Sequence, residues 1–275
     1  MAAGRTRREA GFGAGRISRR AFGNIAVLGI VGVLCLVLLS LVAWRTFDGL
    51  DDATDYATEQ AVAEEMAQIT ADAGDAAEGD SLSLLRSTRL DVPSRLQYPE
   101  LPTGCESVAL TDVLLFFGYE LETSEIADEW LPLSDSDFVN AFLGDPHRAD
   151  GHACMAPGIV TAARSYLEAH GSSLEVEDAT GMTFEELLAT VSEGHPVIAW
   201  CTIDLAETGD SYDVSWQEGR EYHLFPNSHC VVVSGYDIDA GIVYVSDPLV
   251  GTTSYDMATF ATRYYELGAQ AIVIS

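Results

Sequence analysis

The stretch LPTGCESVALTDVLLFF, residues 101–117, predicts a buried helix with a cysteine in its first turn. Thr103 is a favourable N-cap, and Glu106 follows at the spacing of a capping box. Cys105 therefore falls where unpaired backbone N–H groups and the positive end of the helix dipole favour a nucleophilic thiolate. The alternative is a small buried core residue, the usual role of a free cysteine. Only two residues from 108 to 117 are polar, so most faces of the helix are expected to be buried.

The charge of the 275-residue chain is strongly asymmetric. All 14 basic residues are arginines, six of them lie in the first 20 positions, and every one of the 43 acidic residues except Glu9 follows Arg45. The net field of the C-terminal part repels phosphates, so we expect no nucleic acid among its partners. Acidity alone indicates solubility rather than a binding function.

Residues 24–44, NIAVLGIVGVLCLVLLSLVAW, are 21 uncharged positions. A helix of that length crosses a hydrocarbon core of about 30 Å, which predicts a transmembrane anchor in the lipid bilayer. Arginines precede it and acids follow, so residues 1–23 are expected in the cytoplasm and everything after Trp44 outside the cell membrane. A cleaved signal peptide is the competing interpretation, and SRRAF (18–22) resembles a twin-arginine export signal. We favour an uncleaved, single-pass anchor.

Residues 45–90 are rich in Ala, Asp and Glu, which predicts an acidic, solvated stalk, at most a loose helix. The globular domain is expected at 91–275, about the size of one domain. Further helices are predicted by apolar spacing and cap signals at 124–130, 157–169, 183–192 and 257–265. Strands are predicted at 196–203, 229–236, 242–247 and 269–274. The fold class is therefore α+β, with N-terminal helices packed on a C-terminal antiparallel sheet.

The second and third predicted strands form a hairpin whose loop is centred near residue 239. His229, ten residues before that centre, and Asp247, eight after it, come within a residue or two of facing each other across the ladder. Cross-strand neighbours are separated by roughly 4.5–5.5 Å, close enough for a carboxylate to accept a hydrogen bond from an imidazole.

A Cys-His nucleophilic site needs a thiolate, an imidazole that shares its proton, and an acceptor that orients the imidazole. Cys105, His229 and Asp247 supply these three types. The tetrahedral intermediate also needs a donor for its oxyanion, and the Cys105 amide and Gln97 are two candidates. Each residue also has an ordinary interpretation: His229 as a core or rim histidine, Asp247 as a turn residue, and Gln97 as a surface polar residue.

The remaining cysteines allow other uses. Cys154, Cys201 and Cys230 would lie in an oxidising compartment if the domain is exported, so the pairing of these residues is left open. Metal sites could be built from His147, His152 and Cys154, or from His223, His229 and Cys230. Neither spacing matches a closed zinc pattern, so we expect no metal and no cofactor.

Several blocks of the sequence, taken in order, resemble the C39-like cysteine peptidases, which have a papain-like fold. The resemblance is to the stand-alone or membrane-anchored bacterial branch and covers most of 91–275. The blocks are QYPELPTGCES (97–107), FLGDP (142–146), CMAPGIV (154–160), GHPVIAWCTI (194–203), SHCVVVSGYD (228–237), VYVSDPLVG (243–251) and FATRYYELGAQAIVI (260–274).

The resemblance implies that Cys105 is the nucleophile, His229 the general base, Asp247 the orienting acid and Gln97 the oxyanion donor. It also implies a peptide or protein substrate. Better-known C39 peptidases cleave leader peptides next to transporter domains, and this chain has no nucleotide-binding motif, so that specificity does not transfer. By the same resemblance Cys154 and Cys201 are expected in a structural bridge or as buried thiols.

Two other functions remain open at this point. The same triad could cleave cell-wall peptide amides, although the chain has no added wall-binding repeat. Alternatively, the domain could be a catalytically inactive binding domain that keeps the papain-like fold.

Overall fold

The computed structural model describes residues 57–71, 73 and 84–275, which belong to one compact unit that begins at Ala57. The predicted basic tail, 1–23, and the predicted anchor, 24–44, lie outside the described residues. Within the described ranges, no helix is long and apolar enough to cross a membrane.

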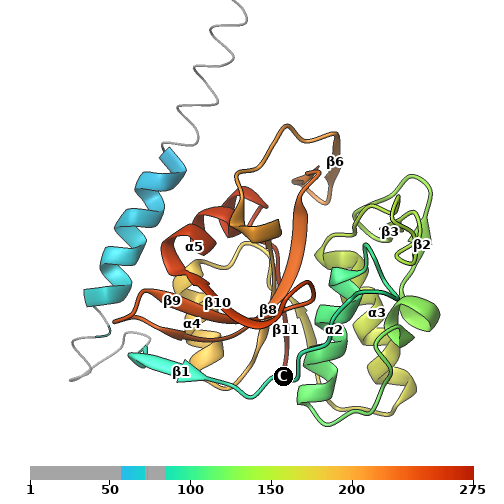
Figure 1. Cartoon of the computed structure of the whole chain (residues 1–275), viewed down its shortest axis with the longest axis horizontal. Helices are drawn as coiled ribbons and strands as arrows, with labels where there is room; N and C mark the ends of the chain where they lie inside the picture. Colours follow the sequence, from blue (N-terminus) through green and yellow to red (C-terminus); the bar gives the residue numbers. More distant parts are fainter. Residues whose placement is uncertain (1–56, 72, 74–83) are drawn as a thin grey trace, which may run out of the picture. The chain divides into compact units, whose positions relative to one another are not determined.

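A seven-stranded antiparallel sheet forms the centre of the unit (Figure 1). Its strands follow the order β10-β9-β8-β5-β11-β4, and β1 pairs with β8 beside them. Their bounds are β1 (Ser87–Arg89), β4 (Val176–Asp178), β5 (Val197–Thr202), β8 (Ser228–Asp237), β9 (Ile242–Asp247), β10 (Gly251–Asp256) and β11 (Ala271–Ile274). The four predicted strands are confirmed as β5, β8, β9 and β11, and the predicted hairpin is β8–β9.

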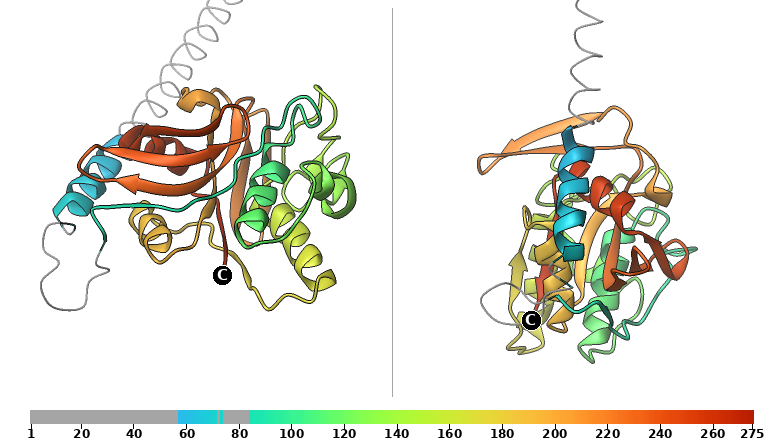
Figure 2. Two further views of the ribbon diagram at one scale, coloured as in Figure 1. Left: turned by 60° about the horizontal axis from the view of Figure 1, so that its bottom comes forward. Right: turned by 90° about the vertical axis from the view of Figure 1, so that its left-hand side faces the viewer.

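Helices cover both faces of the sheet, which Figures 1 and 2 show from three directions. One face carries α2 (Cys105–Phe116), η1 (Ile126–Trp130) and α3 (Ala156–Ala169), and the other carries α4 (Phe184–Ser192), α5 (Met257–Glu266) and helix 57–71. Ile198 and Trp200 of β5 pack with α2 and α3, whereas Val197 and Ala199 pack with α4 and α5. Because β5 is buried on both sides, its sequence is continuously apolar rather than alternating.

The predicted α+β class is confirmed, but the predicted order of helices before strands holds only in part. β1 and β4 are interleaved with the first helices, and α5 lies between β10 and β11. β1 and β4 are short and contain few apolar residues, so no apolar run in the sequence predicts them. The helix predicted at 101–117 is α2, and its residues from Cys105 to Leu114 are all buried, as expected.

Two small sheets flank the central one. β2 (Leu133–Ser134) and β3 (Phe142–Leu143) are parallel, and β6 (Asp213–Gln217) and β7 (Arg220–Leu224) form an antiparallel hairpin. Neither was predicted from the sequence. The β6–β7 hairpin buries Tyr222 and Leu224 in a small cluster with Phe138 and Met155.

Helix 57–71 differs from the solvated stalk predicted for residues 45–90. Val62 and Ile69 are buried in the same cluster as Phe184 of α4. The Glu65 carboxylate accepts hydrogen bonds from the Tyr265 hydroxyl at 2.7 Å and from the Glu185 amide at 3.0 Å. The folded unit therefore starts well before residue 91. Its signal in the sequence is a narrow apolar stripe in which only every third or fourth residue is large.

Candidate active site

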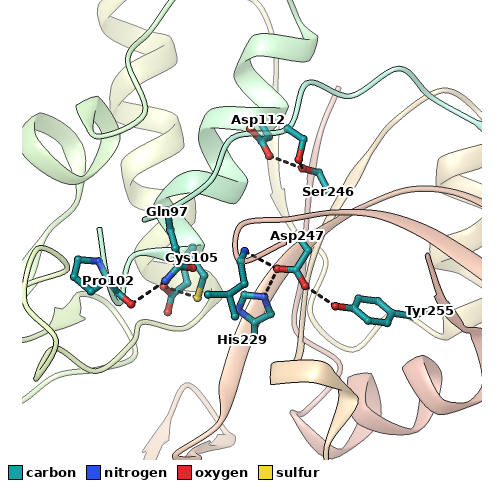
Figure 3. Close-up of polar contacts among 11 residues, drawn as sticks. Gln97, Pro102, Cys105, Asp112, His229, Ser246, Asp247 and Tyr255 are labelled. Atoms are coloured by element: carbon teal, nitrogen blue, oxygen red, sulfur yellow. Dashed lines mark hydrogen bonds and ion pairs between the residues drawn. The ribbon is translucent and has the colours of Figure 1, made fainter. Parts of the chain in front are cut away.

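Cys105, His229 and Gln97 line one cavity of about 370 Å³. Cys105 begins α2, which packs against β8, and its side chain is almost fully buried. His229 is the second residue of β8. Figure 3 shows Cys105 beside His229, with Asp247 on the other side of the imidazole ring. The structure thus brings together all four residues singled out in the sequence.

His229 and Asp247 form a buried pair. His229 Nε2 and Asp247 Oδ1 are 2.8 Å apart, and both side chains are 2% exposed. The β8–β9 register pairs Val232 with Ser246, which places Asp247 two residues along the ladder from the position opposite His229. The predicted offset was one or two residues. This contact confirms the predicted proximity.

Asp247 is held by two more donors. The Leu249 amide donates to Oδ1 at 2.8 Å, and the Tyr255 hydroxyl donates to Oδ2 at 2.7 Å. Burial favours the neutral acid, but the hydrogen bonds from His229, Tyr255 and Leu249 outweigh it and lower the Asp247 pKa below its usual value. Asp247 is therefore ionised at neutral pH. His229 must donate through Nε2, which leaves Nδ1 as the nitrogen available to a thiol.

Glu106 does not form the predicted capping box. The N-cap of α2 is Gly104, without a side-chain cap, and Glu106 turns into the protein. Its Oε1 accepts the Cys154 amide at 2.9 Å, and its Oε2 accepts the Cys105 thiol at 3.3 Å. Burial raises the Glu106 pKa to about 7, although hydrogen bonds and the nearby His229 oppose the shift.

Cys105 is a neutral thiol in this arrangement, contrary to the prediction from its helix position. Burial raises its pKa well above the usual value, and the charge of Glu106 raises it further. A hydrogen bond from the Cys230 backbone acts in the opposite direction. Burial outweighs the effect of the helix dipole on the Cys105 pKa, and the adjacent Glu106 carboxylate adds to the same upward shift.

Gln97 lies at the cavity wall and is 3% exposed. Its Nε2 donates to the Pro102 carbonyl at 2.8 Å, which leaves one N–H of that amide for another acceptor. Its backbone amide donates to the Pro248 carbonyl at 2.8 Å, directly after Asp247. This bond links the segment before α2 to the end of β9.

Asp112 also joins α2 to β9, a contact that was not predicted from the sequence. Ser246 donates to its Oδ2 at 2.6 Å (Figure 3), and the Arg95 amide donates to its Oδ1 at 3.0 Å. Burial raises the Asp112 pKa to about 7. Asp112 follows Cys105 by two helical turns, and a charged residue within a run (108–117) whose only other polar residue is Thr111 was the signal that could have revealed this contact.

The other described cysteines do not form disulfides. Cys154, Cys201 and Cys230 are free and fully or almost fully buried, and burial raises the pKa of each thiol. Cys154 and Cys201 were expected either in a structural bridge or as buried thiols, and the structure has buried thiols. Within the described ranges, no three potential metal ligands cluster, and His147 instead contacts Asp128.

Comparison with known proteins places this site in a family. The family model described as "Peptidase_C39 like family" matches residues 89–272, well over half of the chain. The chain therefore belongs to the C39-like cysteine peptidase family, as the resemblance of its sequence blocks indicated. The matched range contains Gln97, Cys105, His229 and Asp247.

Two relatives illustrate the similarity. The uncharacterized protein YvpB of Bacillus subtilis (strain 168) is 25% identical over 189 residues, which cover 66% of this chain and 72% of YvpB. The crystal structure of a putative C39-like peptidase from Bacillus anthracis matches with a TM-score of 0.58 and 26% identity, covering 70% of this chain and 96% of that chain. The described fold is thus of the papain-like, C39 type.

Proposed function

We propose that this protein is a membrane-anchored, extracytoplasmic cysteine peptidase that hydrolyses peptide bonds through Cys105, His229 and Asp247. The observation that carries the proposal is one cavity lined by Cys105 and His229, with His229 Nε2 held at 2.8 Å by a buried, ionised Asp247. A thiol, an imidazole and an orienting carboxylate are the groups that covalent acyl transfer requires. Membership of a peptidase family supports a peptide substrate.

In the proposed reaction, His229 Nδ1 takes the proton of Cys105 as the sulfur attacks the carbonyl carbon of the substrate. The Cys105 amide and the free N–H of Gln97 stabilise the oxyanion of the tetrahedral intermediate. The resulting imidazolium then protonates the leaving amine, and a thioester remains on Cys105. His229 next activates a water molecule, which hydrolyses the thioester and releases the acid product.

The proposed reaction explains how a neutral thiol can act as a nucleophile. Burial and Glu106 disfavour an isolated thiolate at Cys105. Transfer of the proton to His229 creates an ion pair instead of a single buried anion, and Asp247 stabilises the imidazolium. The site therefore forms its charged nucleophile together with the cation that compensates it.

Alkylation of the full chain in detergent tests this assignment. Iodoacetamide or an epoxysuccinyl probe should label Cys105 in preference to Cys154, Cys201 and Cys230, and His229→Ala should markedly reduce that labelling. His147→Ala is the matched control because His147 is exposed and contacts Asp128 outside the cavity. Equal labelling of several cysteines, unaffected by His229→Ala, would contradict the proposal and favour an inactive binding domain.

Membrane attachment and outward orientation are part of the proposal. They are supported by the uncharged run 24–44, the arginines before it and the acids after it. Protease treatment of intact cells should remove the unit 57–275 and leave the N-terminal tail protected, while alkaline carbonate should not extract the chain. A fully protected unit, or release by carbonate, would contradict this part of the proposal without affecting the assignment of the triad.

A further inference from the structure

The outer face of the β6–β7 hairpin carries an exposed apolar stripe. Val214 is 47% exposed and Trp216 is 69% exposed, and the two lie on the same face of β6 because side chains alternate along a strand. The register pairs Val214 with His223 and Trp216 with Glu221, so these two β7 residues share the outer face. An exposed tryptophan beside another exposed apolar residue is a recurrent feature of binding surfaces.

The inner face of the hairpin is fixed to the body of the protein. Tyr222 and Leu224 are buried in the cluster that includes Phe138. Gln217 exchanges hydrogen bonds with the 137–140 segment, since its Nε2 donates to Asp137 at 3.3 Å and its Oε1 accepts from Asn140 at 2.6 Å. The stripe is therefore presented on a supported platform.

The outer face continues into the proposed active-site cavity. Tyr212, two residues before Val214, and Phe225, directly after β7, both line that cavity. The His223 ring stacks on Phe225, with ring centroids 5.9 Å apart. Trp216 lies four residues beyond Tyr212, which is about 13 Å along an extended chain. A polypeptide that occupies the cavity can thus reach Trp216 with about four further residues.

The segment that carries the stripe is acidic, and Glu221 lies on the outer face itself. Residues 203–224 contain six acidic residues and a single basic one, Arg220, whose guanidinium donates to the Thr180 carbonyl. All six acids are exposed: Asp204, Glu207, Asp210, Asp213, Glu218 and Glu221. Such a field attracts cationic segments and repels acidic ones.

We infer that the outer face of the β6–β7 hairpin docks an extended segment of a polypeptide substrate in which basic and apolar residues alternate. The inference rests on the proposed peptidase function and specifies its substrate class. The apolar side chains pack on Val214 and Trp216, and the basic side chains are attracted by Glu221 and by the other exposed carboxylates of residues 203–224. Among the described strands, β6 pairs only with β7, so its other edge is also accessible to an extended chain.

Peptide binding to the full chain tests the inference. The chain carries Cys105→Ala to prevent turnover and is placed in nanodiscs of zwitterionic phosphatidylcholine. The probe is a fluorescein-labelled decapeptide of alternating Lys and Phe, and anisotropy gives its Kd. Trp216→Ala should weaken binding about tenfold, the size expected when a central aromatic anchor is lost. Leu133→Ala, which truncates a 54% exposed leucine on β2, should leave the Kd unchanged.

Two comparison peptides sharpen the test. Replacing Lys by Glu should abolish binding, as should replacing Phe by Ser, and 0.5 M salt should weaken the Lys-Phe complex. Equal affinity for the Lys and Glu peptides, or an unchanged Kd with Trp216→Ala, would overturn the inference. A dimer in detergent that Trp216→Ala converts to a monomer would also overturn it, because the occupant would then be a second copy of this chain.

The outcomes separate this inference from the proposed function. If Cys105 labelling depends on His229 but Trp216→Ala does not change the peptide Kd, the docking surface is overturned and the peptidase assignment stays intact. Peptide binding that depends on Trp216 in a protein whose Cys105 is inert overturns the peptidase assignment and supports a peptide-binding surface.

Discussion

Two Thr-x-x-Glu segments of this chain have the same spacing but different structures. At Thr183 and Glu186 the capping box forms: Thr183 Oγ1 accepts the Glu186 amide at 3.1 Å, and Glu186 Oε2 accepts the Thr183 amide at 2.7 Å. At Thr103 and Glu106 neither bond forms, and the carboxylate enters the candidate active site. One glutamate therefore stabilises a helix end, and the other adjusts the charge state of a thiol.

Tertiary contacts explain the difference. The Thr103 amide donates to the Pro146 carbonyl at 3.3 Å, and its hydroxyl donates to the Arg148 carbonyl at 3.1 Å. The same loop approaches so closely that a Cβ on Gly151 would lie 2.4 Å from Thr103 Oγ1. Both groups of Thr103 are thus occupied, and Glu106 satisfies the buried Cys154 amide instead. A capping signature indicates a helix start, but its hydrogen bonds depend on which competing partners reach it.

The largest expected effect is on the pH dependence of stability. The Glu106 pKa is about 7 in the folded protein and about 4.5 when unfolded, so its contribution to stability is fully present below pH 4.5 and is lost as the pH rises to 7. Glu106→Gln removes this loss. Relative to wild type, the variant should gain about 2 kcal/mol of unfolding free energy between pH 5 and pH 8. Urea unfolding of the 57–275 unit at both pH values measures the gain.

Glu186→Gln is the matched control for that measurement. It weakens a charge-assisted bond at an exposed helix start, so it should lower stability by about 0.5–1 kcal/mol at both pH values. Asp112, whose pKa is also about 7, contributes equally in every variant and cancels in the comparison. If the unfolding free energy of Glu106→Gln and of wild type changes with pH in the same way, the pKa of Glu106 is not raised in the folded protein.

The next effect concerns the reactivity of Cys105. Glu106→Gln removes the neighbouring negative charge and provides an amide that can donate to the sulfur, so the pKa of the thiol should fall. The thiolate fraction should then rise, and iodoacetamide should alkylate Cys105 about ten times faster at pH 7. Glu186→Gln should react at the wild-type rate. An unchanged rate for Glu106→Gln would rule out electrostatic control by this carboxylate.

The smallest expected effect is the difference in stability between the Thr183→Ala and Thr103→Ala variants. Thr183→Ala removes a real cap and should lower the unfolding free energy by about 1 kcal/mol. Thr103→Ala removes only a hydroxyl shared between the Arg148 carbonyl at 3.1 Å and the Pro146 carbonyl at 3.4 Å, so it should cost less than about 0.5 kcal/mol. Chemical denaturation of the two variants at pH 7 measures both values. A larger loss from Thr103→Ala would mean that the Thr103 contacts contribute more than their geometry indicates.

Local patterns predicted much of this protein because they depend on nearby residues. The apolar runs of β5 and β8, the loop between β8 and β9, and the spacing of His229 and Asp247 are set by strand geometry, and the structure agrees with them. The β6–β7 hairpin was not predicted because its outer face breaks the usual polar pattern of an exposed strand. Residues 57–71 were expected to be solvated, at most a loose helix, because only a narrow stripe of this helix, including Val62 and Ile69, reaches the core.

The chemical groups present, the α+β class and the hairpin that brings His229 to Asp247 could all be predicted before folding, because they follow from alternation and turn length along one stretch of chain. The charge state of the site could not be predicted in this way, because it depends on how distant segments pack. The partners of Glu106, Gln97 and Asp112 come from distant segments, and burial, which shifts the pKa of Glu106, Asp112 and Cys105, exists only after those segments pack together.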